Sequence, residues 1–196
     1  MQILNDNLED DYSDFEKALA LYMYMAHNYT YDYNLLEHSS EMTVSAYQTL
    51  TDKSGICQGL SSLYSFLLLE AGVDAKVMSG CSLSNGGGHR WSYVKINGNY
   101  YHIDPTFVLD SNDSMEFFMM TDDKRLEEDF EPTEGHVTIQ YGAGEHVERI
   151  ASDDTYSPLW TGYFIDLDHD NKKVIYLGFD ENNEISELEF DYGALE

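Results

Sequence analysis

The sequence has 196 residues, which is enough for one domain with an extension or for two small domains, and enough to bury a hydrophobic core without disulfides. Its 37 acidic and 10 basic residues give a formal net charge of −27, which argues against nucleic acid and anionic lipid as partners. Two cysteines are too few for a disulfide framework, and no apolar run approaches the length of a membrane span.

Apolar residues recur at helical spacing in the first part of the chain. The pattern predicts a helix over 13–27, then a loop or short extended piece over 28–40, and a shorter helix over 41–50. The most regular pattern runs from Cys57 to Ala71, and Gly72 follows it as a helix stop. Cys57 is therefore expected in the first turn of a helix.

After this helix the spacing changes to that of strands. A short strand is expected over 75–79, and two more over 90–96 and 100–104. Asn97-Gly98 between the last two is a strong signal for a tight hairpin turn. Such a turn pairs residues whose numbers sum to about 195, so that His89 lies roughly opposite the stretch 104–106.

The remaining elements divide the chain at about residue 130. We expect a short strand over 117–120 and a helix over 124–129, and then a polar, glycine-bearing stretch up to residue 154. Three successive strands are expected beyond it, over 161–167, 173–179 and 185–190. We therefore predict a core over 1–130 and a β-rich C-terminal extension over 131–196, which could belong to the same domain.

Three residues within the predicted core suggest catalysis when they are taken together. Cys57 lies at a helix N-terminus, where free N–H groups and the helix dipole stabilise a thiolate. His89 follows three glycines at a loop-to-strand junction, and Asp104 ends the neighbouring strand, within reach of the imidazole. Each residue alone is more often structural: a core cysteine, a solvated histidine, a turn aspartate. In combination they supply a nucleophile, a base and a group that orients the base.

The segments around these residues resemble a known family. The resemblance rests on Gly55-Ile56-Cys57-Gln58-Gly59-Leu60, on Gly88-His89-Arg90-Trp91-Ser92-Tyr93-Val94, and on the stretch from Asn97 to Phe107 with its Tyr-His-Ile-Asp-Pro-Thr run. In order and spacing they are similar to the transglutaminase-like superfamily, especially its bacterial cysteine protease or amidase members. Residues beyond about 130 are not covered by the resemblance.

The resemblance implies a fold and a chemistry. It implies an α+β, papain-like core in which a helix carrying Cys57 packs on an antiparallel sheet carrying His89 and Asp104. It also implies attack on an amide through a thioester, followed by release to water or to an amine. Family members place a second oxyanion donor upstream of the cysteine, for which Tyr47 and Gln48 are candidates. Trp91 is expected to pack beneath the histidine or to wall the cleft.

Three functions remain open from the sequence. The favoured one is a peptidase or amidase with water as acceptor. The alternatives are a protein-glutamine gamma-glutamyltransferase, which joins an amide to an amine, and a non-catalytic cell-surface binding module. We expect a protein or peptide substrate, basic or amine-bearing if the acidity of the chain serves to attract it. No cofactor is expected.

No metal site is expected, and no leader is visible in this chain. Asp166, Asp168 and Asp170 alternate as in an EF-hand loop, but the glycine and the last glutamate of that motif are missing, so a charged hairpin turn is the better interpretation. The histidines lack the spacing of metal ligands. The first residues lack the basic and apolar regions of a signal peptide. An extracellular or cell-surface location is nevertheless expected from the acidity and from the family resemblance.

Overall fold

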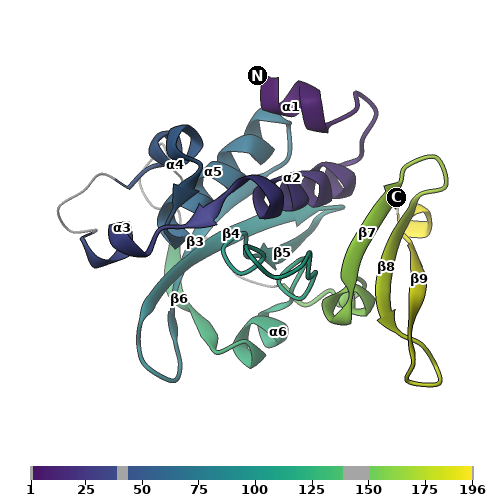
Figure 1. Ribbon diagram of the computed structural model, residues 1–196. Coiled ribbons are helices and arrows are strands. Elements are labelled where there is room, and N and C mark those ends of the chain that lie inside the picture. Colours follow the sequence, from purple (N-terminus) through teal and green to yellow (C-terminus); the bar gives the residue numbers. More distant parts are fainter. Residues whose placement is uncertain (1, 39–43, 139–150, 196) are drawn as a thin grey trace.

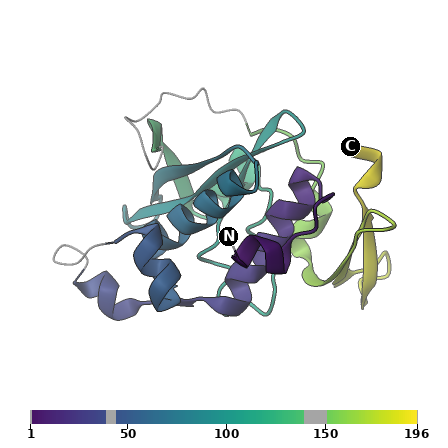
Figure 2. The same ribbon diagram turned by 90° about the horizontal axis from the view of Figure 1, so that it is seen from above.

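A computed structural model describes residues 2–38, 44–138 and 151–195, and it shows a mixed α and β fold (Figures 1 and 2). The first half contains α1 (Gln2–Asn7), α2 (Asp14–Asn28), β1 (Thr30–Tyr31), α3 (Tyr33–Glu37), α4 (Ala46–Asp52), β2 (Ser54–Gly55) and α5 (Cys57–Glu70). The second half contains β3 (Ala75–Ser82), β4 (Gly88–Ile96), β5 (Asn99–Ile103), α6 (Asp122–Glu127), β6 (Phe130–Thr138), β7 (Tyr163–Asp168), β8 (Lys173–Phe179) and β9 (Ile185–Asp191), with short 3₁₀ turns at Ser157–Thr161 and Gly193–Leu195.

An antiparallel four-stranded sheet in the order β5-β4-β3-β6 forms the centre of the fold. Figure 1 shows α2, α4 and α5 on one side of this sheet and α6 on the other. The hairpin register is the expected one, since Ser92 pairs with Ile103 and Ile96 with Asn99. The turn between them has positive φ at both Asn97 and Gly98, which is why this dipeptide suits it.

Both long helices begin where the sequence predicts. Ser13 caps α2 in a capping box, in which its backbone N–H donates to the Glu16 carboxylate at 2.6 Å. By contrast, α5 begins at Cys57 after Ile56, which offers no side-chain cap. The first N–H groups of α5 are therefore left for other partners.

Small residues let α5 approach its neighbours closely. A methyl group built on Gly59 would lie 2.2 Å from the Thr49 hydroxyl oxygen of α4. On the sheet side, the Ser65 hydroxyl lies 2.8 Å from that of Ser92 in β4. Both serines are buried, so these contacts fix the height of α5 above the strand that carries His89.

Three elements differ from the sequence-based expectation. The stretch 117–120 is no strand, because Met119 has a φ of 56° and only Met120 forms a bridge, to His102. The polar segment from Phe130 contains β6, which pairs with β3 at the edge of the sheet. The short helix α3 lies within the segment expected to be a loop. The division at residue 130 itself stays a prediction.

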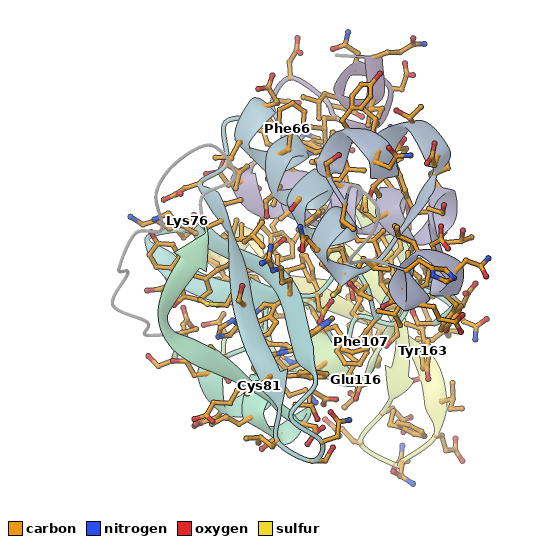
Figure 3. The ribbon with its side chains drawn as sticks, turned by 90° about the vertical axis from the view of Figure 1, so that its left-hand side faces the viewer. Phe66, Lys76, Cys81, Phe107, Glu116 and Tyr163 are labelled. Atoms are coloured by element: carbon orange, nitrogen blue, oxygen red, sulfur yellow. The ribbon has the colours of Figure 1, made fainter. Side chains whose placement is uncertain are left out.

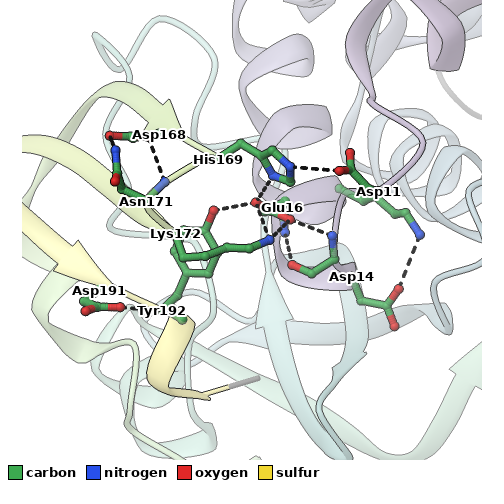
Figure 4. A network of polar contacts seen from close by, with 12 residues as sticks. Asp11, Asp14, Glu16, Asp168, His169, Asn171, Lys172, Asp191 and Tyr192 are labelled. Atoms are coloured by element: carbon green, nitrogen blue, oxygen red, sulfur yellow. Dashed lines mark hydrogen bonds and ion pairs between the residues drawn. The ribbon is translucent and has the colours of Figure 1, made fainter.

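The last three strands form a separate sheet in the order β7-β8-β9, as the spacing predicts. It lies beside α2 (Figures 1 and 2) and is fastened to it through Glu16, which is fully buried. The Glu16 carboxylate accepts hydrogen bonds from Tyr192 and from His169 Nδ1, the latter at 2.6 Å, and it pairs with Lys172 at 3.4 Å (Figure 4). Helix and sheet are therefore joined by a charged group that burial alone would disfavour.

Among the described residues, no helix combines the length and the apolar character needed to cross a membrane.

Candidate active site

Cys57 is half-buried at the first position of α5. Its thiol is hydrogen-bonded to His89 and accepts the backbone N–H of Arg90 from β4. The helix dipole adds a partial positive charge at this end of α5. The sulfur thus lies where three sources of positive potential meet.

His89 connects the cysteine to a buried carboxylate. Its Nε2 lies 2.6 Å from Oδ2 of Asp104, which leaves Nδ1 for the sulfur of Cys57. The imidazole is 8% exposed and lies against the rings of Phe107 and Phe130, with centroids 4.9 and 4.7 Å away. The structure therefore brings these three candidate residues together in one connected chain of hydrogen bonds.

Asp104 is fully buried just beyond the end of β5. Its Oδ1 accepts the backbone N–H of Thr106 at 3.0 Å, and its own N–H donates to the carbonyl of Phe117 at 2.9 Å. Pro105 follows directly, so that the chain turns away from the sheet and β5 stops short of pairing with His89. This turn is what aims the carboxylate at the imidazole.

The electrostatics of the three groups favour an ion pair. Burial alone raises the pKa of the Cys57 thiol, but the hydrogen bond and charge of His89, together with the Arg90 N–H, bring it below its usual value. Burial alone lowers the pKa of His89, whereas Asp104 and Cys57 raise it to about 9. Each of these two groups thus favours its charged form, a thiolate beside an imidazolium.

Tyr31 is a site residue that the sequence did not reveal. Strand β1 pairs in parallel with β2, with Tyr31 opposite Gly55, two residues before the cysteine. The backbone N–H of Cys57 donates to the Tyr31 hydroxyl. Burial above all raises the pKa of this phenol to about 12, so that it keeps its proton. No sequence motif marks a contact that depends on two strands of two residues each.

Tyr47 and Gln48, the oxyanion candidates from the sequence, lie on α4, whereas Trp91 packs beneath His89. Tyr47 is 76% exposed on α4, and the Gln48 amide donates to Asp52 on the same helix. Trp91 is fully buried beneath His89, with ring centroids 5.8 Å apart, and its indole N–H donates to Nδ1 of His102 at 2.8 Å. Cys81 lies near the end of β3, opposite Gly88 (Figure 3). None of these four residues lines the cleft described next.

A cleft of about 380 Å³ opens beside His89 and Tyr31. Its other lining residues are mainly aromatic or aliphatic and include one carboxylate: Tyr33, Leu36, Thr106, Phe107, Leu109 and Asp110. Cys57 is not one of its lining residues, but two residues that are, His89 and Tyr31, contact its thiol and its backbone N–H respectively. The cleft therefore lies next to the groups that surround Cys57.

One family model matches more than half of the chain. The family model of the transglutaminase-like superfamily matches residues 2–105, a range that includes Cys57, His89 and Asp104. The chain belongs to the transglutaminase-like superfamily. Members of this superfamily are usually cysteine-dependent enzymes.

The relatives are distant. The kyphoscoliosis peptidase of Mus musculus is 22% identical over 150 residues, which is 67% of this chain and 23% of that protein. The chain thus spans about a quarter of the length of this curated relative. LapG of Legionella pneumophila superimposes with a TM-score of 0.54 at 15% identity, over 81% of this chain and 80% of LapG. An arylamine N-acetyltransferase of Bacillus cereus covers 95% of this chain and 89% of its own at a TM-score of 0.44 and 14% identity. The likeness to LapG shows a shared papain-like fold.

Proposed function

We propose that this member of the superfamily is a cysteine-dependent acyl-transfer enzyme that cleaves amide bonds through a thioester, most directly as a peptidase or amidase. Cys57 is the nucleophile, His89 the acid and base, and Asp104 the residue that orients His89. The observation that carries the proposal is the unbroken hydrogen-bonded chain from the Cys57 sulfur through His89 to buried Asp104.

The proposed reaction has two halves. In the first, the Cys57 thiolate attacks the amide carbon, and His89 Nδ1 gives its proton to the leaving amine as the C–N bond breaks. In the second half, the oxygen of a water molecule attacks the thioester carbon while His89 takes a proton from that water. The C–S bond then breaks, which releases the carboxylic acid and restores the Cys57 thiolate. Throughout, Nε2–H stays bonded to Asp104, which holds the ring in place.

Two groups can donate to the oxyanion of the tetrahedral intermediate, the Cys57 N–H at the start of α5 and the hydroxyl of Tyr31. The N–H now donates to the Tyr31 oxygen, so the oxyanion must replace that hydrogen bond. A phenol that stays protonated can donate to a developing negative charge. Tyr31 therefore takes the role for which the sequence suggested Tyr47 or Gln48.

The cleft suggests which substrates fit. Aromatic and aliphatic walls suit the long stem of a side chain, and the exposed Asp110 suits a cationic head. The net charge of −27 favours the same partners at long range. A peptide with a lysine or arginine near the scissile amide is accordingly the proposed substrate class.

The test is isotope-resolved product analysis. A peptide library containing glutamine, lysine and arginine is incubated in H₂¹⁸O, with and without a small primary amine, using the wild-type protein and Cys57→Ala. Hydrolysis leaves one ¹⁸O in each new carboxylate, whereas transfer leaves the mass of the amine. We expect ¹⁸O products from the wild type alone. Amine adducts as the main product would favour the gamma-glutamyltransferase. Equal amounts of product from the wild type and Cys57→Ala would refute the proposed enzymatic activity.

A further inference from the structure

Arg125 is fully buried, although it lies in a short, strongly polar helix, α6, whose sequence is typical of a solvent-exposed surface. Buried arginines are rare unless they are paired. Nothing in the motif that marks Cys57, His89 and Asp104 includes it, and it follows Asp104 by a stretch of turns and bends. A charged group in this position calls for a partner.

The partner of Arg125 is the catalytic carboxylate. Its Nη2 lies 3.1 Å from Oδ2 of Asp104, the same oxygen that His89 Nε2 approaches at 2.6 Å. Among the described residues, Nε and Nη1 have no hydrogen-bond acceptor, and Nη2 contacts Asp104 as an ion pair without the geometry of a hydrogen bond. Asp104 thus stands between two cations that share one of its oxygens.

Aromatic rings hold the guanidinium in this place. Its carbon lies 4.5 Å from the ring centroid of Trp91 and 4.5 Å from that of Phe130. The same two rings flank His89, with centroids 5.8 and 4.7 Å away. Arg125 and His89 are therefore positioned by the same walls as well as by the same carboxylate.

The charges in the site balance only when Arg125 is counted. The active form has a thiolate at Cys57, an imidazolium at His89 and a carboxylate at Asp104, which together carry one net negative charge in a buried site. Asp104 by itself opposes the thiolate and raises the pKa of Cys57. The guanidinium cancels this charge, and with His89 it keeps the pKa of Asp104 low despite burial.

We propose that Arg125 is a positioning residue of this site, which fixes the buried Asp104 carboxylate and balances its charge so that Cys57 can exist as a thiolate beside protonated His89. The inference rests on the proposed function. Arg125 does not touch the substrate, and it acts through Asp104.

The titratable groups near Arg125 and Cys57 bear on how the pH profile is interpreted. Arg125 is faced by Asp104, by Glu128 at the end of its own helix and by the Tyr22 phenol of α2. Glu128 is engaged by Lys124. Cys57 is faced by His89, Asp104 and the Tyr31 phenol. The phenols stay neutral in the range tested, since burial raises the pKa of both.

The test follows the alkylation rate of Cys57 against pH, by mass spectrometry, in the wild type, Arg125→Met and Arg125→Lys. Methionine keeps much of the volume and loses the charge, whereas lysine keeps the charge. We expect the midpoint of the Arg125→Met profile to rise by about one pH unit, which is about a tenfold lower rate below the wild-type midpoint. Arg125→Lys keeps the charge but loses the stacking of the planar guanidinium, so its midpoint should lie between those of the wild type and Arg125→Met.

A purely structural role for Arg125 predicts a different result. Arg125→Met would then unfold more easily while its Cys57 midpoint stayed at the wild-type value, and that result would overturn the proposal. A wild-type Cys57 that titrates like a free thiol would instead overturn the proposed function itself. The two failures are therefore distinguishable.

A second comparison covers the case in which Arg125→Met does not fold. Asp104→Asn leaves the guanidinium buried without its anion, so adding Arg125→Met should raise the melting temperature above that of Asp104→Asn alone. Reactivity of Cys57 should stay low in both. A double variant less stable than Asp104→Asn would show that Arg125 serves packing and not the carboxylate, and would refute the proposal.

Discussion

At the scale of single residues, the candidate site brings together side chains from four separate parts of the chain. The N-terminus of α5 carries Cys57, β4 carries His89, the turn after β5 carries Asp104 and β1 carries Tyr31. The first three share a motif order that the sequence reveals. Tyr31 does not, because its place depends on a parallel β1–β2 contact that no local pattern encodes.

Arg125 is a second residue whose role the sequence does not reveal, although the helix that carries it is predicted. Its segment, Asp122-Asp123-Lys124-Arg125-Leu126-Glu127, predicts an exposed helix, and the helix is present with Thr121 as its cap. What the pattern cannot tell is that this one cation points inward to Asp104. Which charged residues form a buried ion pair depends on tertiary contacts, and these cannot be predicted from composition and periodicity.

Replacing Tyr31 tests the proposed second oxyanion donor. Tyr31→Phe removes one hydroxyl and should lower kcat about a hundredfold with little change in KM, because the oxyanion forms only in the transition state. Alkylation of Cys57 should change little. The matched control is Tyr33→Phe, since Tyr33 lines the same cleft and is 72% exposed. Equal losses in the two variants would contradict the assignment.

At the scale of elements, strands with alternating residues and clear turns could be predicted, and others could not. The β4–β5 register follows from Asn97-Gly98, and β7, β8 and β9 follow from their spacing. Strand β6 was missed because it carries Pro132 and polar residues, a composition that is tolerated at a sheet edge. The apolar run at 117–120 predicts a strand, but its backbone reverses at Met119.

The contact between α4 and α5 gives a test of how the cysteine helix is placed. Gly59→Ala puts a methyl group 2.2 Å from the Thr49 hydroxyl oxygen, so either the Thr49 side chain must turn or the helices must separate. We expect a loss of about 1–3 kcal/mol in the free energy of unfolding, measured with denaturant. Adding Thr49→Ala should recover much of it. A double variant no more stable than Gly59→Ala would show that the crowding lies elsewhere.

At the scale of the whole molecule, the Glu16 network fastens the C-terminal sheet to α2 (Figure 4). Burial alone raises the pKa of Glu16, but the hydrogen bonds from Tyr192, Ser13 and His169 lower it from 4.5 to about 2. The ionised form is therefore favoured in the folded state. Its contribution is complete above pH 4.5 and is lost as the pH falls through 2.

Replacing Glu16 should reveal this pH dependence. Glu16→Gln is expected to lower the free energy of unfolding at pH 7 by up to about 3 kcal/mol, the equivalent of the pKa shift. The difference from the wild type should shrink toward pH 2, measured by denaturant titration at several pH values. A difference that stays constant from pH 7 to pH 2 would show that the carboxylate charge is not what stabilises the contact.

The most direct test of the whole account is the alkylation rate of Cys57 by iodoacetamide as a function of pH, with site assignment by mass spectrometry, in the wild type and His89→Ala. We expect fast alkylation below the usual thiol pKa, with the ion pair persisting until His89 loses its proton near pH 9. In His89→Ala the profile should move to higher pH, while Cys81 stays unchanged as an internal control. A Cys57 that is inert, or that is alkylated at the same rate in both proteins, would contradict an activated thiolate paired with His89 and therefore the proposed enzymatic activity.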